Sequence, residues 1–106
     1  MAATETPTIE PATVEEVASE ARTGHAPQWK VLFHNDDHTP MDFVTAVLMR
    51  FFGHDQAAAV RIMLTIHHRG IGLAGVYPLE LAELKREQTL SAARPHYPLR
   101  VTLEPA

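Results

Sequence analysis

The densest group of chemically capable side chains in the sequence is the polar run from His34 to Thr39. Asn35, Asp36 and Asp37 offer an amide oxygen and two carboxylates. All of these accept hydrogen bonds, so together they suit a cation that carries several N–H donors. Two other interpretations remain open, because Asn and Asp also build turns by bonding to nearby backbone, and acidic clusters also bind metal ions. The run therefore predicts a working surface whose ligand this pattern alone does not name.

A second candidate group is the histidine pair His67 and His68. Adjacent side chains on a helix point about 100° apart, so the two rings do not easily chelate one ion. The pattern favours a core-edge histidine at His67 and an exposed one at His68. No H-E-x-x-H spacing occurs, and we expect neither a metal nor a cofactor. A small metal-binding enzyme that uses His34, His38 and the neighbouring acids is kept as a rival hypothesis.

Nucleophilic and phosphate-binding motifs are missing from the sequence. Cysteine is absent, which excludes a thiolate nucleophile and a disulfide framework. No G-x-S-x-G motif and no Gly-rich phosphate loop occurs. We therefore predict a binding module and not an enzyme.

A strand is predicted to lead into the polar run, and a helix is predicted to follow it. The strand, Trp29–Phe33, is rich in residues that favour β-structure and ends abruptly. Thr39 is expected to be the N-cap of the helix, with Pro40 at its first position and Asp42 completing a signature like a capping box. Apolar residues then recur at helical spacing until Gly53.

Four more elements are predicted further along the chain. They are a helix from Asp55 to Arg69 that Gly70 ends, a strand Ile71–Tyr77, a helix from Pro78 to Ala93 and a strand from Leu99 to Leu103. Leu81, Leu84 and Gln88 fall along one side of the third helix. The order βααβαβ predicts a single small α+β domain, with a three-stranded antiparallel sheet and three helices packed on one face.

Charge divides the chain into two parts. Residues 1–28 hold five Glu and one Arg, whereas residues 29–106 hold eight acids and eight Lys or Arg. We expect 1–28 to be a disordered N-terminal extension, with at most a short amphipathic stretch at Val14–Ala21, and 29–106 to be the core domain. The neutral core lacks the basic surface of a nucleic-acid-binding protein, and no apolar run approaches the roughly 18 residues of a membrane span. Because no signal-peptide pattern occurs, we expect a cytoplasmic location. We also expect a monomer.

Several short motifs, taken together, resemble one known family. They are Val31-Leu32-Phe33, Asn35-Asp36-Asp37, Thr39-Pro40-Met41-Asp42-Phe43-Val44, Ile62-Met63-Leu64, Ile66-His67, Gly75-Val76-Tyr77, Ala82-Glu83-Leu84-Lys85 and Tyr97-Pro98-Leu99. From Trp29 to Glu104 the sequence is similar to the ClpS adaptors of bacterial Clp proteases.

The resemblance implies a receptor for N-degrons. Such an adaptor binds substrates that begin with a free Leu, Phe, Tyr or Trp and delivers them to the N-domain of an AAA+ unfoldase, ClpA or ClpC, for degradation by ClpP. The residues implied to hold the α-amino group are Asn35, Asp37 and His67, with Asp36 beside them. The implied side-chain pocket is made of Phe33, His34, Thr39, Met41, Val44, Met63, Ile66 and Leu99, with Met41 as its gate. Glu80 and Lys85 match the unfoldase contacts, and the acidic extension matches a segment that helps to engage the unfoldase.

Three positions depart from the family pattern. His34 stands where an aliphatic residue is usual, Leu84 where Thr is usual, and Pro78 where a polar cap is usual. The first departure bears on the pocket, and the others bear on the docking surface. A structural module like those of the ribosomal stalk, without an amine-binding pocket, remains the alternative function.

Overall fold

The computed structural model describes residues 26–106, and the predicted extension lies outside the described residues as far as residue 25. Its elements are β1 (Gln28–His34), α1 (Met41–Arg50), α2 (Gln56–Arg69), β2 (Ile71–Pro78), α3 (Leu79–Ala93) and β3 (Arg100–Pro105). The predicted order βααβαβ is confirmed. No helix in the described part of the chain is long and apolar enough to cross a membrane.

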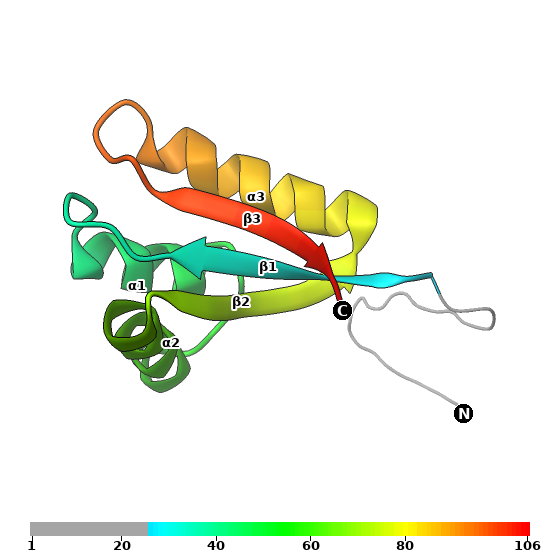
Figure 1. Cartoon of the computed structure of the whole chain (residues 1–106), viewed down its shortest axis with the longest axis horizontal. Coiled ribbons are helices and arrows are strands. Elements are labelled where there is room, and N and C mark those ends of the chain that lie inside the picture. The colour runs from blue at the N-terminus through cyan, green and yellow to red at the C-terminus, as the bar shows by residue number, and fades with distance from the viewer. Residues whose placement is uncertain (1–25) are drawn as a thin grey trace.

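The sheet places the first strand in its middle. Its order is β2-β1-β3, and β1 is antiparallel to both neighbours. The three helices pack on one face of this sheet, and no element of residues 26–106 covers the other face (Figure 1). The predicted α+β class, the antiparallel sheet and the one-sided packing are therefore confirmed.

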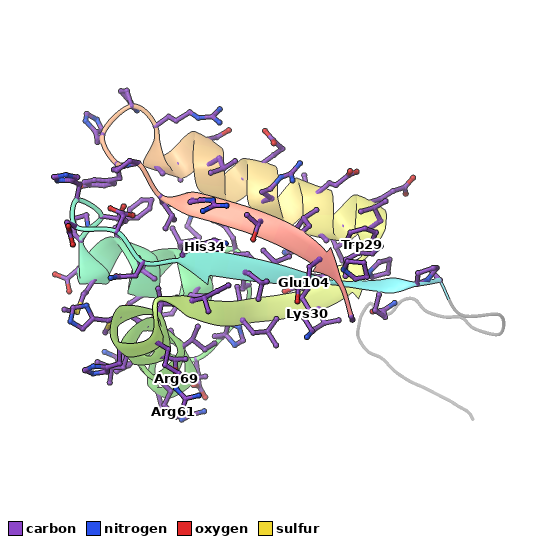
Figure 2. All side chains as sticks on the ribbon, viewed as in Figure 1. Trp29, Lys30, His34, Arg61, Arg69 and Glu104 are labelled. Carbon is purple, nitrogen blue, oxygen red and sulfur yellow. The ribbon has the colours of Figure 1, made fainter. Side chains whose placement is uncertain are left out.

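Strand β1 shows why the sheet has one buried and one open face. Val31 and Phe33 are fully buried, whereas Lys30, Leu32 and His34 alternate with them and retain exposure. Successive side chains of a strand point to opposite faces, so the first pair faces the helices and the other three face outward. Figure 2 shows Lys30 and His34 on the open face.

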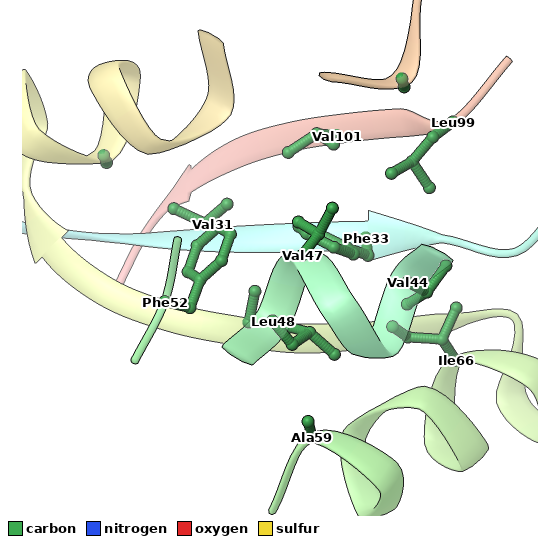
Figure 3. Close-up of a cluster of buried hydrophobic side chains, with 13 residues drawn as sticks. Val31, Phe33, Val44, Val47, Leu48, Phe52, Ala59, Ile66, Leu99 and Val101 are labelled. Carbon is green, nitrogen blue, oxygen red and sulfur yellow. The ribbon is translucent and has the colours of Figure 1, made fainter. Parts of the chain in front are cut away.

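The buried side chains form one cluster between the sheet and the helices (Figure 3). Its larger members come from β1, α1, the turn after α1, α2 and the segment that includes β3, and they are Val31, Phe33, Val44, Val47, Leu48, Phe52, Ile66, Leu99 and Val101. The Phe33 and Phe52 rings meet edge to face with centroids 5.4 Å apart, an arrangement that adds to the stabilisation from burial.

Helix α3 packs through small residues and not through its leucines. Ala82, Thr89 and Ala93 are its buried residues. Leu81 and Leu84, which the spacing grouped on one side, are both exposed. Small side chains let the helix lie close to the strands, and the Thr89 hydroxyl is satisfied because it donates to the backbone oxygen of Lys85 at 2.9 Å.

The predicted start of α1 is wrong, and that of α2 is confirmed. Pro40 occupies the N-cap position of α1, and the helix begins at Met41, so Thr39 is not the cap. The Asp55 carboxylate does cap α2, where it accepts from the backbone N–H of Ala58 at 2.8 Å. Helix α2 ends as predicted at Gly70, whose φ of 88° is a left-handed conformation that suits glycine.

Candidate functional site

Asp36 organises the loop that follows β1. One of its carboxylate oxygens accepts from the backbone N–H groups of His38 and Thr39, both at 2.8 Å. The other accepts from the Thr39 hydroxyl at 2.7 Å. Burial alone raises the pKa of this carboxyl, but these hydrogen bonds and the charge of His38 outweigh it, and the net pKa is lowered. Asp36 and Thr39 therefore hold the loop and have little capacity left for a ligand.

The two neighbours of Asp36 are left facing solvent. Asn35 and Asp37 are both exposed. Within residues 26–106, neither of these side chains makes a hydrogen bond with the rest of the chain. The Asp36 turn thus presents one amide and one carboxylate from adjacent parts of the same loop.

The C-terminal end of α2 meets this loop. The backbone N–H of Asn35 donates to the carbonyl oxygen of Gly70 at 2.9 Å, and the Gly70 N–H donates to Ile66 at the same distance. His67 lies within this last turn, is exposed, and has its ring 5.3 Å from that of His68. The fold therefore brings the last turn of α2, which contains His67, to the loop of Asn35 and Asp37 from a distant part of the sequence.

The predicted apolar residues gather at the same end of the core. Phe33, Val44, Ile66 and Leu99 are buried there (Figure 3). Met63 packs half-buried against this cluster, whereas Met41 at the start of α1 is 44% exposed. Flexible Met side chains at the edge of a core adapt readily to different ligand shapes.

A close approach between α2 and β2 shapes this end of the molecule. A Cβ atom at Gly72 would lie 2.5 Å from a side-chain carbon of Ile66, which is too near for any other residue without displacement. Gly72 therefore allows Ile66 to pack directly on the strand. This packing fixes the last turn of α2, and with it His67, against the sheet.

His34 does not lie among the predicted pocket residues. Its ring is on the open face of the sheet, opposite to Phe33, where Nε2 hydrogen-bonds the Thr102 hydroxyl of β3 at 2.7 Å. Burial, followed by the positive charge of Arg100, lowers the pKa of His34. The expected contribution of His34 to the pocket is thus corrected, and the period-two alternation of the strand is the signal that would have placed it.

The described part of the chain contains no cluster of side chains that could bind a metal ion. No group of three or more His, Asp or Glu side chains is close enough there to hold an ion. His34 is turned to the open face, so it is separated from the acids of the loop.

Comparison with known proteins identifies the family. Residues 24–102 match the family of the ATP-dependent Clp protease adaptor protein ClpS. The chain belongs to the ClpS family. A ClpS of Aromatoleum aromaticum is 48% identical over 86 residues, covering 80% of this chain and 84% of the relative. One from Rhodospirillum centenum is 46% identical over 95 residues, covering 89% and 88%. ClpS proteins are adaptors of the Clp protease, so this chain is an adaptor and not an enzyme.

A solved ClpS structure has the same fold. Agrobacterium tumefaciens ClpS2 bound to L-phenylalaninamide matches with a TM-score of 0.74 and 32% identity, covering 77% of this chain and all of that one.

The two residues expected to contact the unfoldase differ in availability. Glu80 is exposed in the first turn of α3. Lys85 is half-buried, and its ammonium donates to the carbonyl oxygen of Phe51 at 2.6 Å and lies 5.8 Å from the centre of the Tyr77 ring. Burial lowers the pKa of Lys85. The Lys85 ammonium therefore links α3 to the residue that follows α1, and it is less available to a partner protein.

An open hollow that the motifs did not indicate lies beside Lys85. It has a volume of about 500 Å³ and is lined by Arg50, Phe51, Leu84, Glu87, Gln88, Ser91 and Ala92. Leu84, one of the departures from the ClpS pattern, is 51% exposed on its wall. This hollow is separate from the loop of Asn35 and the core end near Leu99.

Proposed function

We propose that this ClpS chain captures polypeptides by a free N-terminal amino group, with Asn35, Asp37 and His67 as the ligands of that group. A protonated α-amine has three N–H donors, and an amide oxygen, a carboxylate and a neutral imidazole nitrogen together offer three acceptors. The observation that carries the proposal is the hydrogen bond from Asn35 to Gly70, because it joins the loop to the turn of α2 that holds His67.

The side chain of the captured residue would enter the apolar end of the core. Val44, Met63, Ile66 and Leu99 supply apolar contacts there, and Met41 stands exposed at the edge as the gate. Burial of one large apolar side chain contributes roughly 1.5–3 kcal/mol, and each hydrogen bond to a charged group contributes about 1.5–3 kcal/mol. Association costs about 4 kcal/mol or more, so the surplus corresponds to an affinity on the order of micromolar.

The ligand of the solved relative agrees with this chemistry. L-Phenylalaninamide carries a free α-amino group and an aromatic side chain, and it is bound to Agrobacterium tumefaciens ClpS2. We extend the preference to N-terminal Leu, Phe, Tyr and Trp in this chain, since each is large, apolar and unbranched at Cβ. Branched residues such as Ile and Val would meet Met41 at the gate.

The proposal includes delivery of the captured chain to the N-domain of an AAA+ unfoldase of the ClpA or ClpC type. Exposed Glu80 supports a polar contact on α3. Lys85 would contribute chiefly by fixing α3 against Phe51. A binding measurement with isolated ClpA and ClpC N-domains distinguishes the two partners, and Glu80→Gln should weaken the interaction with the right one.

A panel of fluorescent peptides that differ only in their first residue tests the capture step. Peptides that begin with Phe, Leu, Tyr or Trp should raise the fluorescence anisotropy at micromolar protein, and those that begin with Ile or Ser should not. Acetylation of the amino group should abolish binding, because the amide that results has lost the positive charge and two donors. Equal affinity for the acetylated and the free Phe peptide would refute the amine site.

A further inference from the structure

The open face of the sheet presents three rows of side chains. The strand register sets these rows across β2, β1 and β3, and each row holds one residue from each strand: Ile71 with His34 and Arg100, Leu73 with Leu32 and Thr102, and Val76 with Lys30 and Glu104. All of these residues are exposed or half-buried. Figure 2 shows Lys30, His34 and Glu104 on this face. Its middle row is therefore mainly apolar, and its charged residues lie in the two outer rows.

Large apolar side chains on this face are accessible to solvent. Ile71, Leu73 and Val76 of β2 are 40%, 44% and 41% exposed, and Leu32 of β1 lies beside Leu73. No element of residues 26–106 covers them. Apolar residues that line up on one face, and are not scattered singly, mark an interaction surface.

The charged residues of β3 lie at opposite ends of the same face. Arg100 belongs to the first row and Glu104 to the last. Within residues 26–106 the ion pairs are Lys30–Glu104 and Arg86–Glu87, so Arg100 has no acidic partner there. The Lys30–Glu104 pair is weak, because its atoms are 4.0 Å apart and its side chains are 41% and 56% exposed. The Glu104 carboxylate can therefore accept a guanidinium in addition to Lys30.

This arrangement of charged and apolar residues is self-complementary. A two-fold axis that lies between two such sheets, along the middle row, places the first row of one copy over the last row of the other. Arg100 then faces Glu104 of the second copy. Ile71 faces Val76, and Leu73 meets its own counterpart. An axis along the strands would instead place β3 over β2, and both charges would lie over apolar side chains. The pattern thus fits a second copy of this chain in the first orientation.

The remaining contact of this orientation adds little repulsion. His34 faces Lys30 of the second copy. Burial, followed by the positive charge of Arg100, lowers the pKa of His34, so its ring is neutral near pH 7. The domain as a whole does not oppose association either, because residues 29–106 hold eight acids and eight Lys or Arg.

We infer that two copies of this chain associate through the open faces of their sheets, related by this two-fold axis. Three strands of about six residues give a footprint of roughly 280 Å² on each copy, well below the roughly 800 Å² that each partner buries in a stable complex. The dimer is therefore weak, and the monomer expected from the sequence prevails in dilute solution. The helix-covered face stays exposed in both copies, so the inference does not depend on the proposed amine site.

Sedimentation equilibrium of the full chain tests the association. As the protein concentration rises from micromolar to millimolar, the weight-average mass should increase from the 11.8 kDa of one chain toward twice that value. Leu73→Asp should keep the mass at that of one chain, whereas Leu81→Asp, a matched change at an exposed leucine of α3, should still associate. A constant mass up to millimolar protein, or loss of association in Leu81→Asp alone, would overturn the inference.

Charge reversal tests the orientation of the two copies. Arg100→Glu and Glu104→Arg should each abolish association, because each places like charges opposite one another across the interface. An equimolar mixture of these two variants should associate again, since every acid then faces an arginine. Arg86→Glu, the same reversal on α3, should have no effect. A mixture that stays monomeric under conditions where the unmodified chain associates would refute the two-fold arrangement.

Discussion

The backbone N–H of Asn35 donates to the carbonyl oxygen of Gly70 at 2.9 Å. This bond joins the end of β1 to the end of α2, two points far apart in the sequence. The left-handed Gly70 residue supplies the acceptor at the same point where it ends the helix. The position of the loop acids and that of the helix turn with His67 therefore both depend on Gly70. A change in the backbone at Gly70 should displace the proposed ligands relative to one another.

Gly70→Ala should reduce both stability and peptide capture. A left-handed conformation costs a residue with a Cβ about 1–2 kcal/mol, and no atom lies within 4 Å of a Cβ at this position, so the cost is purely conformational. Gly53→Ala is a matched control, because Gly53 has a φ of 72° and equally open surroundings. Urea unfolding should show similar losses for both variants, whereas peptide anisotropy should fall for Gly70→Ala alone. Equal capture by the two variants would contradict this dependence on Gly70.

Asp37→Asn should weaken capture of a Phe peptide without affecting stability. Loss of one charged hydrogen bond, about 1.5–3 kcal/mol, lowers the affinity roughly ten-fold to a hundred-fold. Asp37 is exposed, so the unfolding free energy should stay the same. Asp42→Asn removes the same charge at an exposed position of α1 and should leave capture nearly intact. Titration calorimetry measures both, and equal effects would mean that only the general charge of this region matters.

Asp36→Asn should destabilise the protein in a pH-dependent way. The pKa of Asp36 is lowered in the folded state, so its stabilising effect is present above the ordinary Asp pKa of about 3.9 and is lost as the pH falls through the lowered value. The difference in unfolding free energy between the two proteins should be constant from pH 7 to 5 and shrink below about pH 4. Urea titrations across this range measure it. A difference as large at pH 2 as at pH 7 would show that the hydrogen bonds do not depend on the charge.

His34→Gln should flatten the stability profile in weak acid. Burial and Arg100 lower the pKa of His34, so its neutral ring favours the fold above the ordinary His pKa of about 6.5, and this contribution is lost as the pH falls through the lowered value. Gln does not titrate and can still bond Thr102. Arg100→Gln should raise the pKa of His34 toward the ordinary value, which an NMR titration of the ring reports. An unchanged pKa would mean that burial alone is responsible.

Much of the fold was predictable because its boundaries are chemically distinct. Asp55 and Gly70 enclose α2 with a cap and a left-handed stop, and both were found from the sequence. The start of α1 was not, because the Thr39 hydroxyl bonds the Asp36 carboxylate in the folded loop and the helix has no side-chain cap. There Asp36 accepts from Thr39, and the helix begins after Pro40.

The remaining error concerns which way a side chain faces. His34 was assigned to the pocket from its place beside Asn35 in the sequence, whereas strand alternation turns it away. The roles of Asn35, Asp37 and His67 as amine ligands stay predictions, since they depend on a partner molecule.

The central place of β1 has a consequence for synthesis of the chain. β1 pairs with β2 on one side and with β3, at residues 100–105, on the other. While the polypeptide leaves the ribosome, the edge of β1 that will receive β3 stays without its hydrogen bonds until these last strand residues are translated. An unpaired central strand is a template for association with other chains. Truncation before Arg100 should therefore produce aggregation and not a smaller folded adaptor.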